Sequence, residues 1–264
     1  MRAGQRAGNG SGRRSVTVRA TSLLSAFDAD HRVLNLSQLA RRSGLPLATV
    51  HRLAADLVES RLLVRRVDGR YEIGALLWRL GLLAPPTELR ELALPHLQDL
   101  VAATGHTVHL AVLDGAGALV IERLSGTRTL PTRHSPGAHL PLHCTAVGKA
   151  LLAYADPPLA DRVVRDLRRH TAYTVVDPAA LHRQLEEIRR SGLARSAQEH
   201  RIGVSSLAVP VNGHEGVVAA LGLLAPLRSP RPAGVLPHLR AASASIGADF
   251  IRSGLADAPS GGLR

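Results

Sequence analysis

Residues 37–53 read SQLARRSGLPLATVHRL, and this stretch decides the fold of the first third of the chain. Ser37 is predicted to cap a short helix that runs through Arg42, because a serine side chain accepts hydrogen bonds from the amides of a first helical turn. Gly44 is predicted to end that helix, since glycine adopts the left-handed C-terminal turn without strain. Leu45 and Pro46 then open a second helix. Two helices joined by so short a turn are typical of a helix-turn-helix.

The second helix of this pair, expected over residues 47–60, has one apolar and one polar face. Its apolar stripe follows helical spacing and consists of Val50, Leu53, Ala54, Leu57 and Val58. The opposite face carries Thr49, His51 and Arg52. A helix that is packed on one side and polar on the other suits the major groove of DNA, which is about 12 Å wide.

A further helix is expected before this pair, over residues 16–27, and a hairpin after it. Asp68-Gly69 lies between two β-prone runs, residues 62–67 and 70–73, and this dipeptide favours a tight hairpin turn. Three helices and a hairpin predict a winged helix-turn-helix. The candidate DNA contacts are Thr49, His51 and Arg52 to base edges, Ser37, Arg41 and Arg42 to phosphates, and Arg65, Arg66 and Arg70 of the hairpin to phosphates or the minor groove.

The charge of the chain favours the same partner. The 264 residues carry a formal net charge of +12, and residues 1–84 hold 14 arginines against six acidic residues. A small, strongly basic module points to a polyanion such as nucleic acid. Hydrophobic residues make up 45% of the chain, which excludes disorder over its whole length.

The compartment is expected to be the cytoplasm. No apolar run reaches the roughly 18–20 residues that a membrane-spanning helix needs. The first twenty residues hold five arginines and no continuous apolar segment, so a secretory signal is not expected. Cys144 is the single cysteine of the sequence, which rules out an intrachain disulfide and fits a reducing environment.

The remainder of the chain mixes helices and strands. A helix over residues 75–83 ends before Pro85-Pro86, the expected domain boundary. Further helices are expected over residues 87–104, 146–154, 159–170, 179–191 and 235–251, and strands over 107–113, 119–124, 193–196, 204–211 and 217–224. Strands in pairs followed by helices predict an α+β domain with a largely antiparallel sheet.

Several motifs in order resemble the IclR family of bacterial transcriptional regulators. The helix-turn-helix stretch, Asp68-Gly69-Arg70-Tyr71, the run HLPLHCTAVGKA at residues 139–150, Glu199-His200 with Gly203, and AVPV at residues 208–211 carry the resemblance. It spans about residues 16–251. The chain departs from the family at Leu47-Ala48, where relatives often have polar residues, so more of the base readout is expected from Thr49, His51 and Arg52.

The resemblance implies an architecture and partners. It implies a winged helix-turn-helix, a linker helix and a GAF-like effector domain in a homodimer or homotetramer that binds pseudo-palindromic operator DNA. The corresponding segments are residues 1–14 as a disordered basic arm, 15–84 as the DNA-binding domain, 85–104 as the linker helix, 105–254 as the effector-binding domain and 255–264 as a disordered tail. Movement of the linker helix upon effector binding would change the spacing of the paired reading helices.

The resemblance also implies an effector cup on the sheet. It places Leu140, Ala146 and Val147 at the rim, and Ser196, Ser206, Gly222 and Leu224 on the other wall. The free amides of Ala146 and Val147 begin a helix, and such amides favour an anion, so we expect an organic acid. Because Ser196 and Leu224 replace more polar residues, our hypothesis is a larger, partly apolar acid, aromatic acids included. The alternative is a vestigial pocket with hydrophobic filling.

Enzymatic and metal chemistry find little support in the sequence. Gly148-Lys149-Ala150 lacks the spacing of a phosphate-binding loop, and no Gly-x-Ser-x-Gly elbow occurs. His143 and Cys144 are adjacent, and the side chains of adjacent residues seldom point at each other as a catalytic Cys/His pair must. A packed or pocket-lining thiol is therefore expected at Cys144. The residues that could converge on a metal are His106, His109, His134, His139, His143, Cys144 and His200. None has the close paired spacing of a zinc motif, and neither a metal nor a cofactor is expected.

The sequence therefore predicts a DNA-binding transcriptional regulator, a repressor or an activator, tuned by a small organic acid. Two alternatives stay open. One is a metabolite-binding protein with weak or lost DNA binding, and the other is an enzyme built on the C-terminal domain.

Overall fold

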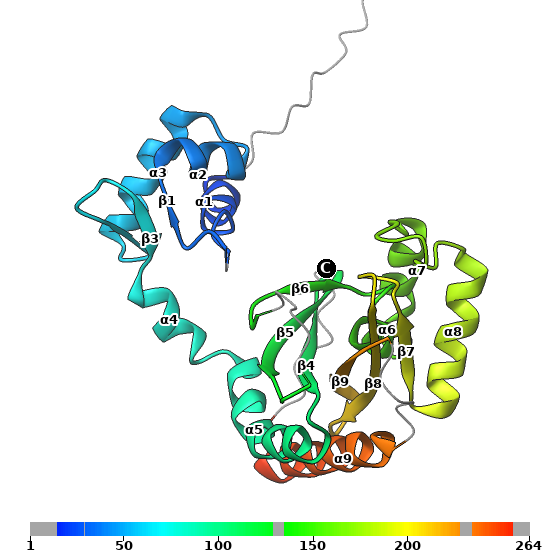
Figure 1. Cartoon of the computed structure of the whole chain (residues 1–264). Helices are drawn as coiled ribbons and strands as arrows, with labels where there is room; N and C mark the ends of the chain where they lie inside the picture. Colours follow the sequence, from blue (N-terminus) through cyan, green and yellow to red (C-terminus); the bar gives the residue numbers. More distant parts are fainter. Residues whose placement is uncertain (1–14, 29, 129–134, 228–233, 256–264) are drawn as a thin grey trace, which may run out of the picture. The chain divides into compact units, whose positions relative to one another are not determined.

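A computed structural model describes residues 15–28, 30–128, 135–227 and 234–255. The chain divides into two compact units, Met1–Leu83 and Ala84–Arg264 (Figure 1). The expected basic arm at residues 1–14 and residues 256–264 of the expected tail lie outside the described residues. None of the described helices combines the length and the apolar composition needed to cross a membrane.

The first unit is a winged helix-turn-helix. Its elements are α1 (Val16–Leu24), β1 (Val33–Leu34), α2 (Leu36–Ser43), α3 (Leu47–Glu59), β2 (Leu63–Arg65), β3 (Tyr71–Ile73) and α4 (Ala75–Gly81). The strands pair antiparallel in the order β1-β3-β2. The expected stripe on α3 faces the core, where Val50, Leu53, Ala54 and Leu57 are buried against α1 and α2.

The start of α2 differs from the sequence expectation. The N-cap is Asn35, whose side chain accepts a hydrogen bond from the Gln38 amide, while the Gln38 side chain accepts one from the Asn35 amide. This reciprocal capping box satisfies two amides at once, and it leaves Ser37 exposed in the first turn. The prediction of Ser37 as the cap is wrong for that reason. Gly44 ends the helix in the left-handed conformation, as expected, with φ of 68°.

The second unit contains one antiparallel sheet. Its helices are α5 (Pro85–Thr104), α6 (Ala146–Ala153), α7 (Pro157–Arg165), α8 (Pro178–Ser191) and α9 (Leu236–Ser253). Its strands are β4 (Thr107–Asp114), β5 (Gly117–Leu124), β6 (His139–Pro141), β7 (Ala194–Ala197), β8 (Val204–Asn212) and β9 (Val217–Pro226), in the sheet order β6-β5-β4-β9-β8-β7. The expected α+β fold with an antiparallel sheet is confirmed.

Helices cover both faces of this sheet (Figure 1). Helices α5 and α9 pack side by side on one face, against larger side chains such as Leu110, Val209 and Leu221. Helix α6 packs on the other face, where the strands present small residues: Ala111, Ala118, Ala208 and Ala220. Small side chains let a helix approach the sheet closely. Helix α6 therefore packs over the middle of the sheet, where these alanines lie. The helix that we expected as a separate linker, α5, belongs to the core of the second unit.

Helix α7 ends at Arg165, whereas the sequence predicted a helix through residue 170. The hydroxyl of Thr174 explains the difference, because it accepts hydrogen bonds from the amides of His170 and Thr171, at 3.0 and 2.8 Å. Such side-chain bonds offer the backbone an alternative to the helix. The short strand β6 was also not expected from the sequence.

Candidate functional site

The outward side of α3 and its surroundings form the candidate DNA interface. His51 and Arg52 are exposed and Thr49 is partly exposed. The other candidates, Ser37, Arg41, Arg42, Arg65, Arg66 and Arg70, are exposed as well. The hairpin turns at Gly69, with φ of 79°, and the Arg70 amide donates to the Asp68 carboxylate at 3.1 Å.

The arginines of this unit fall into two groups. Arg42 donates to the carbonyl oxygen of Ala26 at 2.6 Å and pairs with Asp28. Arg66 pairs with Glu72 at 2.9 Å, and Arg70 pairs with Asp68 at 2.7 Å. In contrast, within the part of the chain that the structure describes, no carboxylate pairs with Arg41, Arg52 or Arg65. The second group is therefore the better placed for phosphates or bases.

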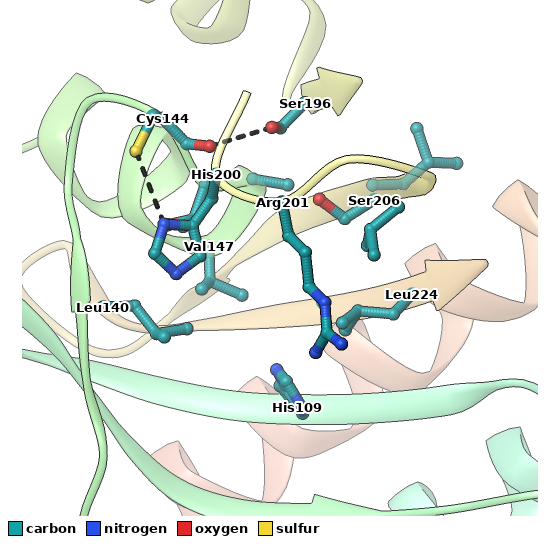
Figure 2. A pocket seen from close by; sticks show the side chains of 14 residues that line it. His109, Leu140, Cys144, Val147, Ser196, His200, Arg201, Ser206 and Leu224 are labelled. Carbon is teal, nitrogen blue, oxygen red and sulfur yellow. Dashed lines mark hydrogen bonds between the residues drawn. The ribbon is translucent and has the colours of Figure 1, made fainter. Parts of the chain in front are cut away.

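A pocket lies on the α6 face of the sheet in the second unit (Figure 2). All seven residues that the resemblance assigned to the effector cup line it. The full lining is His109, Leu140, Cys144, Thr145, Ala146, Val147, Ser196, His200, Arg201, Val204, Ser206, Leu207, Gly222 and Leu224. Five strands, β4, β6, β7, β8 and β9, and the start of α6 thus converge on one pocket.

The start of α6 is fixed against the pocket by its cap. Thr145 accepts a hydrogen bond from the Gly148 amide at 3.1 Å and donates one to the Pro141 carbonyl at 2.8 Å. A Cβ on Gly148 would lie 2.5 Å from that same carbonyl oxygen, so glycine is required for the close approach. Within the pocket, a Cβ on Gly222 would lie 2.5 Å from the Val147 side chain.

The polar groups of the pocket differ in what they can offer a ligand. The Ser196 hydroxyl donates to the Cys144 carbonyl oxygen at 2.9 Å, so its proton is already used inside the protein. Ser206 is only partly buried. The amides of Ala146 and Val147 are in the first turn of α6, where no intrahelical acceptor serves them.

Sequence reasoning did not assign Arg201 to the pocket, nor Thr145, Val204 or Leu207. Arg201 lies in the loop between β7 and β8, and its guanidinium extends over the pocket near His109 and Leu224 (Figure 2). Among the described residues, no carboxylate forms an ion pair with it. The sequence signal was its position inside the motif formed by Glu199-His200 and Gly203.

Next to the pocket, the one lysine of the chain is fully buried. The Lys149 ammonium lies 2.6 and 2.7 Å from the two carboxylate oxygens of Glu199. Burial lowers the pKa of Lys149 and raises the pKa of Glu199, while their mutual attraction opposes both shifts. A lone lysine within the apolar run of α6 was the sequence signal for this pair.

The loop that carries Glu199, His200 and Arg201 is held by two threonines. Thr171 donates to the carbonyl oxygen of Gln198 at 2.7 Å, and Thr174 donates to that of Glu199 at 2.6 Å. Gln198 itself has a left-handed backbone, with φ of 61°. The loop is thus fixed to the segment between α7 and α8.

Some of the expected histidines converge and others do not. His143, Cys144 and His200 gather with His170, a residue that the sequence analysis did not single out. These four could hold a metal. His109 lines the pocket from β4, His139 pairs with Asp114, and His106 is buried elsewhere. His134 lies outside the described residues.

Burial raises the pKa of the Cys144 thiol to about 12.

The pocket is small and a larger hollow lies elsewhere in the unit. The pocket volume is about 40 Å³, whereas a cavity that holds benzene measures roughly 150 Å³. The pocket is therefore smaller than a cavity that holds an aromatic ring. A hollow of about 270 Å³ lies between the start of α5 and the end of α9. Its ionisable lining groups are Glu88 and Tyr154, and the negative charge of the Glu88 carboxylate would repel an acid.

A winged helix-turn-helix joined to a second domain that has a pocket is the architecture of a DNA-binding regulator. Comparison with known proteins places it further. Residues 84–246 match the model of the bacterial transcriptional regulator IclR C-terminal domain, and residues 16–66 match the IclR helix-turn-helix domain. The chain therefore belongs to the IclR family of transcriptional regulators, which bind DNA through the first domain and effectors through the second.

Individual relatives cover nearly the whole chain. The probable transcriptional regulator SauR of Cupriavidus necator is 33% identical over 87% of this chain and 94% of that protein. The glycerol operon regulatory protein of Streptomyces coelicolor is 31% identical over 87% and 95%. The crystal structure of an IclR homologue from Microbacterium hydrocarbonoxydans, complexed with 4-hydroxybenzoate, is 31% identical, with a TM-score of 0.83 over 90% of this chain and 100% of that one.

Proposed function

We propose that this chain is a transcriptional regulator whose affinity for operator DNA is controlled by a small organic acid bound in the α6 pocket, and that it is not an enzyme. The observation that carries the proposal is that, among the described residues, Arg41, Arg52 and Arg65 of the first unit and Arg201 in the pocket of the second unit form no ion pair with a carboxylate. Since the operator is chromosomal, the cytoplasm is the proposed place of action.

The DNA contacts of the proposal are divided by role. Arg52, together with Thr49 and His51, reads base edges from α3, while Arg41 and Arg65 contact phosphates. Arg42, Arg66 and Arg70 have carboxylate partners, so we assign them mainly to holding the unit in shape. Ser37 contacts phosphate from the start of α2, where amides and hydroxyl face outward.

The acid is proposed to bind with its carboxylate between Arg201 and the first amides of α6. A guanidinium binds a carboxylate by charge-assisted hydrogen bonds, and the helix start adds partial positive charge. Leu140, Leu224 and Gly222 offer an apolar surface for the rest of the molecule. The relative that is complexed with 4-hydroxybenzoate supports this class. Because the pocket measures only about 40 Å³, an aromatic acid requires the exposed Arg201 side chain to move outward.

Coupling to DNA is proposed to run through α5, which is the first helix of the second unit. Arg90 of α5 pairs with the buried Glu122 of β5 at 2.7 Å, and His96 of α5 contacts Asp249 of α9 at 2.6 Å. A shift of the sheet upon acid binding would reach α5 through these contacts. The spacing of two reading helices, and thus the fit to operator half-sites, would follow.

A second copy of the chain is the proposed partner of α4. No residue of α4 is buried, and Trp78 and Leu83, the latter just beyond its end, are 67% and 80% exposed. Leu80 and Leu82 are exposed as well. Exposed large apolar side chains at this density mark an interface, and a two-fold dimer matches a pseudo-palindromic operator.

The test is a gel-shift titration of the full chain with the DNA upstream of its own gene, with and without a panel of organic acids. We expect a specific complex in low salt whose affinity changes with at least one acid. Absence of any complex with intact acid binding would favour the metabolite-binding protein that has lost DNA binding. A neutral analogue of each acid serves as the control, and an equal response to both would argue against the carboxylate site.

A further inference from the structure

Four metal-ligating side chains from three segments gather at one end of the α6 face. His143 and Cys144 precede α6, His170 follows α7, and His200 lies between β7 and β8. One ring nitrogen of His143, the Sγ of Cys144 and one ring nitrogen of His170 all lie within 4.8 Å of one another. The Nδ1 of His200 lies 3.9 Å from the same Sγ, and the two side chains face each other (Figure 2).

We propose that His143, Cys144, His170 and His200 form a Zn²⁺-binding site. Three imidazoles and one thiolate are a donor set that suits zinc, which prefers four nitrogen and sulfur ligands in a tetrahedron. Ligand atoms in such a tetrahedron lie roughly 3.3–3.8 Å apart. The distances between the donors therefore need to shorten by about 1 Å. His170 is exposed, so its ring can rotate toward the other three. The thiol releases its proton to solvent when the metal binds.

The surroundings of His143 fit a metal ligand. Its Nε2 is 2.9 Å from the carbonyl oxygen of Arg168, and a donated N–H there leaves Nδ1 for the metal. Ligating histidines usually make such a bond through their second nitrogen, because it fixes the ring orientation.

The scaffold brings the other ligands together before any metal arrives. Thr171, next to His170, donates to the carbonyl of Gln198, and Thr174 donates to that of Glu199. The rings of His170 and His200 consequently meet edge to face, with centroids 5.0 Å apart, and His170 lies 5.7 Å from the ring of His143. The ordering cost that a metal must offset is thereby reduced.

The proposed site borders the acid pocket but does not depend on it. Cys144 and His200 line both, so a bound Zn²⁺ would add positive charge at the pocket wall. Zinc binding does not require that the acid or the operator has been assigned correctly, and it is measured without either.

The experiment uses the full chain without a histidine tag, stripped with a chelator and then titrated with Zn²⁺ or Co²⁺. We expect one equivalent of Zn²⁺ per chain after dialysis, measured by elemental analysis. With Co²⁺ we expect visible d–d bands of a tetrahedral site and a near-ultraviolet thiolate-to-cobalt band. Cys144→Ser should abolish the near-ultraviolet band, and His170→Ala should weaken binding by about tenfold or more.

The matched control is His182→Ala, which removes an exposed histidine on α8 whose ring contacts the carbonyl of Pro178. It should bind metal as the unaltered chain does. Circular dichroism checks that each variant is folded. Less than 0.1 equivalent of bound Zn²⁺, a cobalt spectrum without the thiolate band, or equal losses in His170→Ala and His182→Ala would each overturn the proposal.

Discussion

The ammonium of Lys149 is fully buried and lies 2.6 Å from Oε1 of Glu199. This ion pair joins α6, which begins at the pocket, to the loop that carries Arg201. The Lys149 ammonium also lies 3.4 Å from the carbonyl oxygen of Arg195 in β7. One buried cation thereby connects three of the segments around the pocket.

Lys149→Met should destabilise the chain strongly, because it leaves the Glu199 carboxylate buried without its partner. Removing one member of a buried pair costs about 3–5 kcal/mol. Replacing both members, in Lys149→Met with Glu199→Leu, should recover much of the loss. Urea unfolding followed by circular dichroism measures both variants. A double variant no more stable than Lys149→Met would contradict the explanation.

Arg52→Ala should weaken specific DNA binding by about 1–3 kcal/mol and relax the sequence preference, if Arg52 contacts a base. Arg66→Ala is the matched control, since Arg66 is paired with Glu72. It should change affinity less and leave the preference intact. Fluorescence anisotropy with the operator and with scrambled DNA, over a range of salt concentrations, separates the two effects. Equal losses on both DNAs would remove Arg52 from the base readout.

Arg201→Gln should weaken the binding of a carboxylate effector by about 1.5–3 kcal/mol, the size of a hydrogen bond to a charged group. Calorimetry with 4-hydroxybenzoate as the first probe, and 4-hydroxybenzamide as its neutral counterpart, measures the effect. The variant should lose the difference between the two. Arg195→Gln, an exposed arginine on β7 outside the pocket, is the control. DNA binding without effector should not change in either variant.

Asp249→Asn should lower stability at neutral pH and matter less in acid. The hydrogen bond from His96, together with Arg252, holds the pKa of Asp249 below its usual value. A carboxyl whose pKa is lowered by folding stabilises the native state above its unfolded pKa of about 3.9, and this contribution is lost as the pH falls through the folded value. The Tm difference between the two proteins should therefore shrink below about pH 4. Asp161→Asn, at an exposed position of α7, is the control, and the Tm difference that it causes should not shrink in this way.

Periodic and turn signals made much of the fold predictable. The stripe from Val50 to Leu57 and the Asp68-Gly69 hairpin depend on local sequence, and the structure has both. The end of α7 was not predictable, because it depends on the hydroxyl of Thr174 folding back on its own segment. The position of the cap required a choice between Asn35 and Ser37, two side chains that can both cap a helix and that lie two positions apart.

The residues of the candidate site also fall into those that the sequence could predict and those that it could not. Residues on the strands and at the start of α6 could be assigned to the pocket through the family resemblance. Arg201 and His170 could not, because each lies in a loop whose path is set by hydrogen bonds between distant segments. Threonines 171 and 174 determine that path, and their role is visible only once the two loops are adjacent.

The anchoring of the β7–β8 loop by backbone carbonyls has a consequence for how such a protein diversifies. Thr171 and Thr174 donate hydrogen bonds to the main-chain carbonyl oxygens of Gln198 and Glu199. The path of the loop therefore does not depend on which side chain occupies position 201. If Arg201 binds the effector as proposed, one substitution at position 201 would change the ligand preference of the pocket and leave the fold in place. Gene duplicates built on this frame can acquire new inducers without first losing their fold.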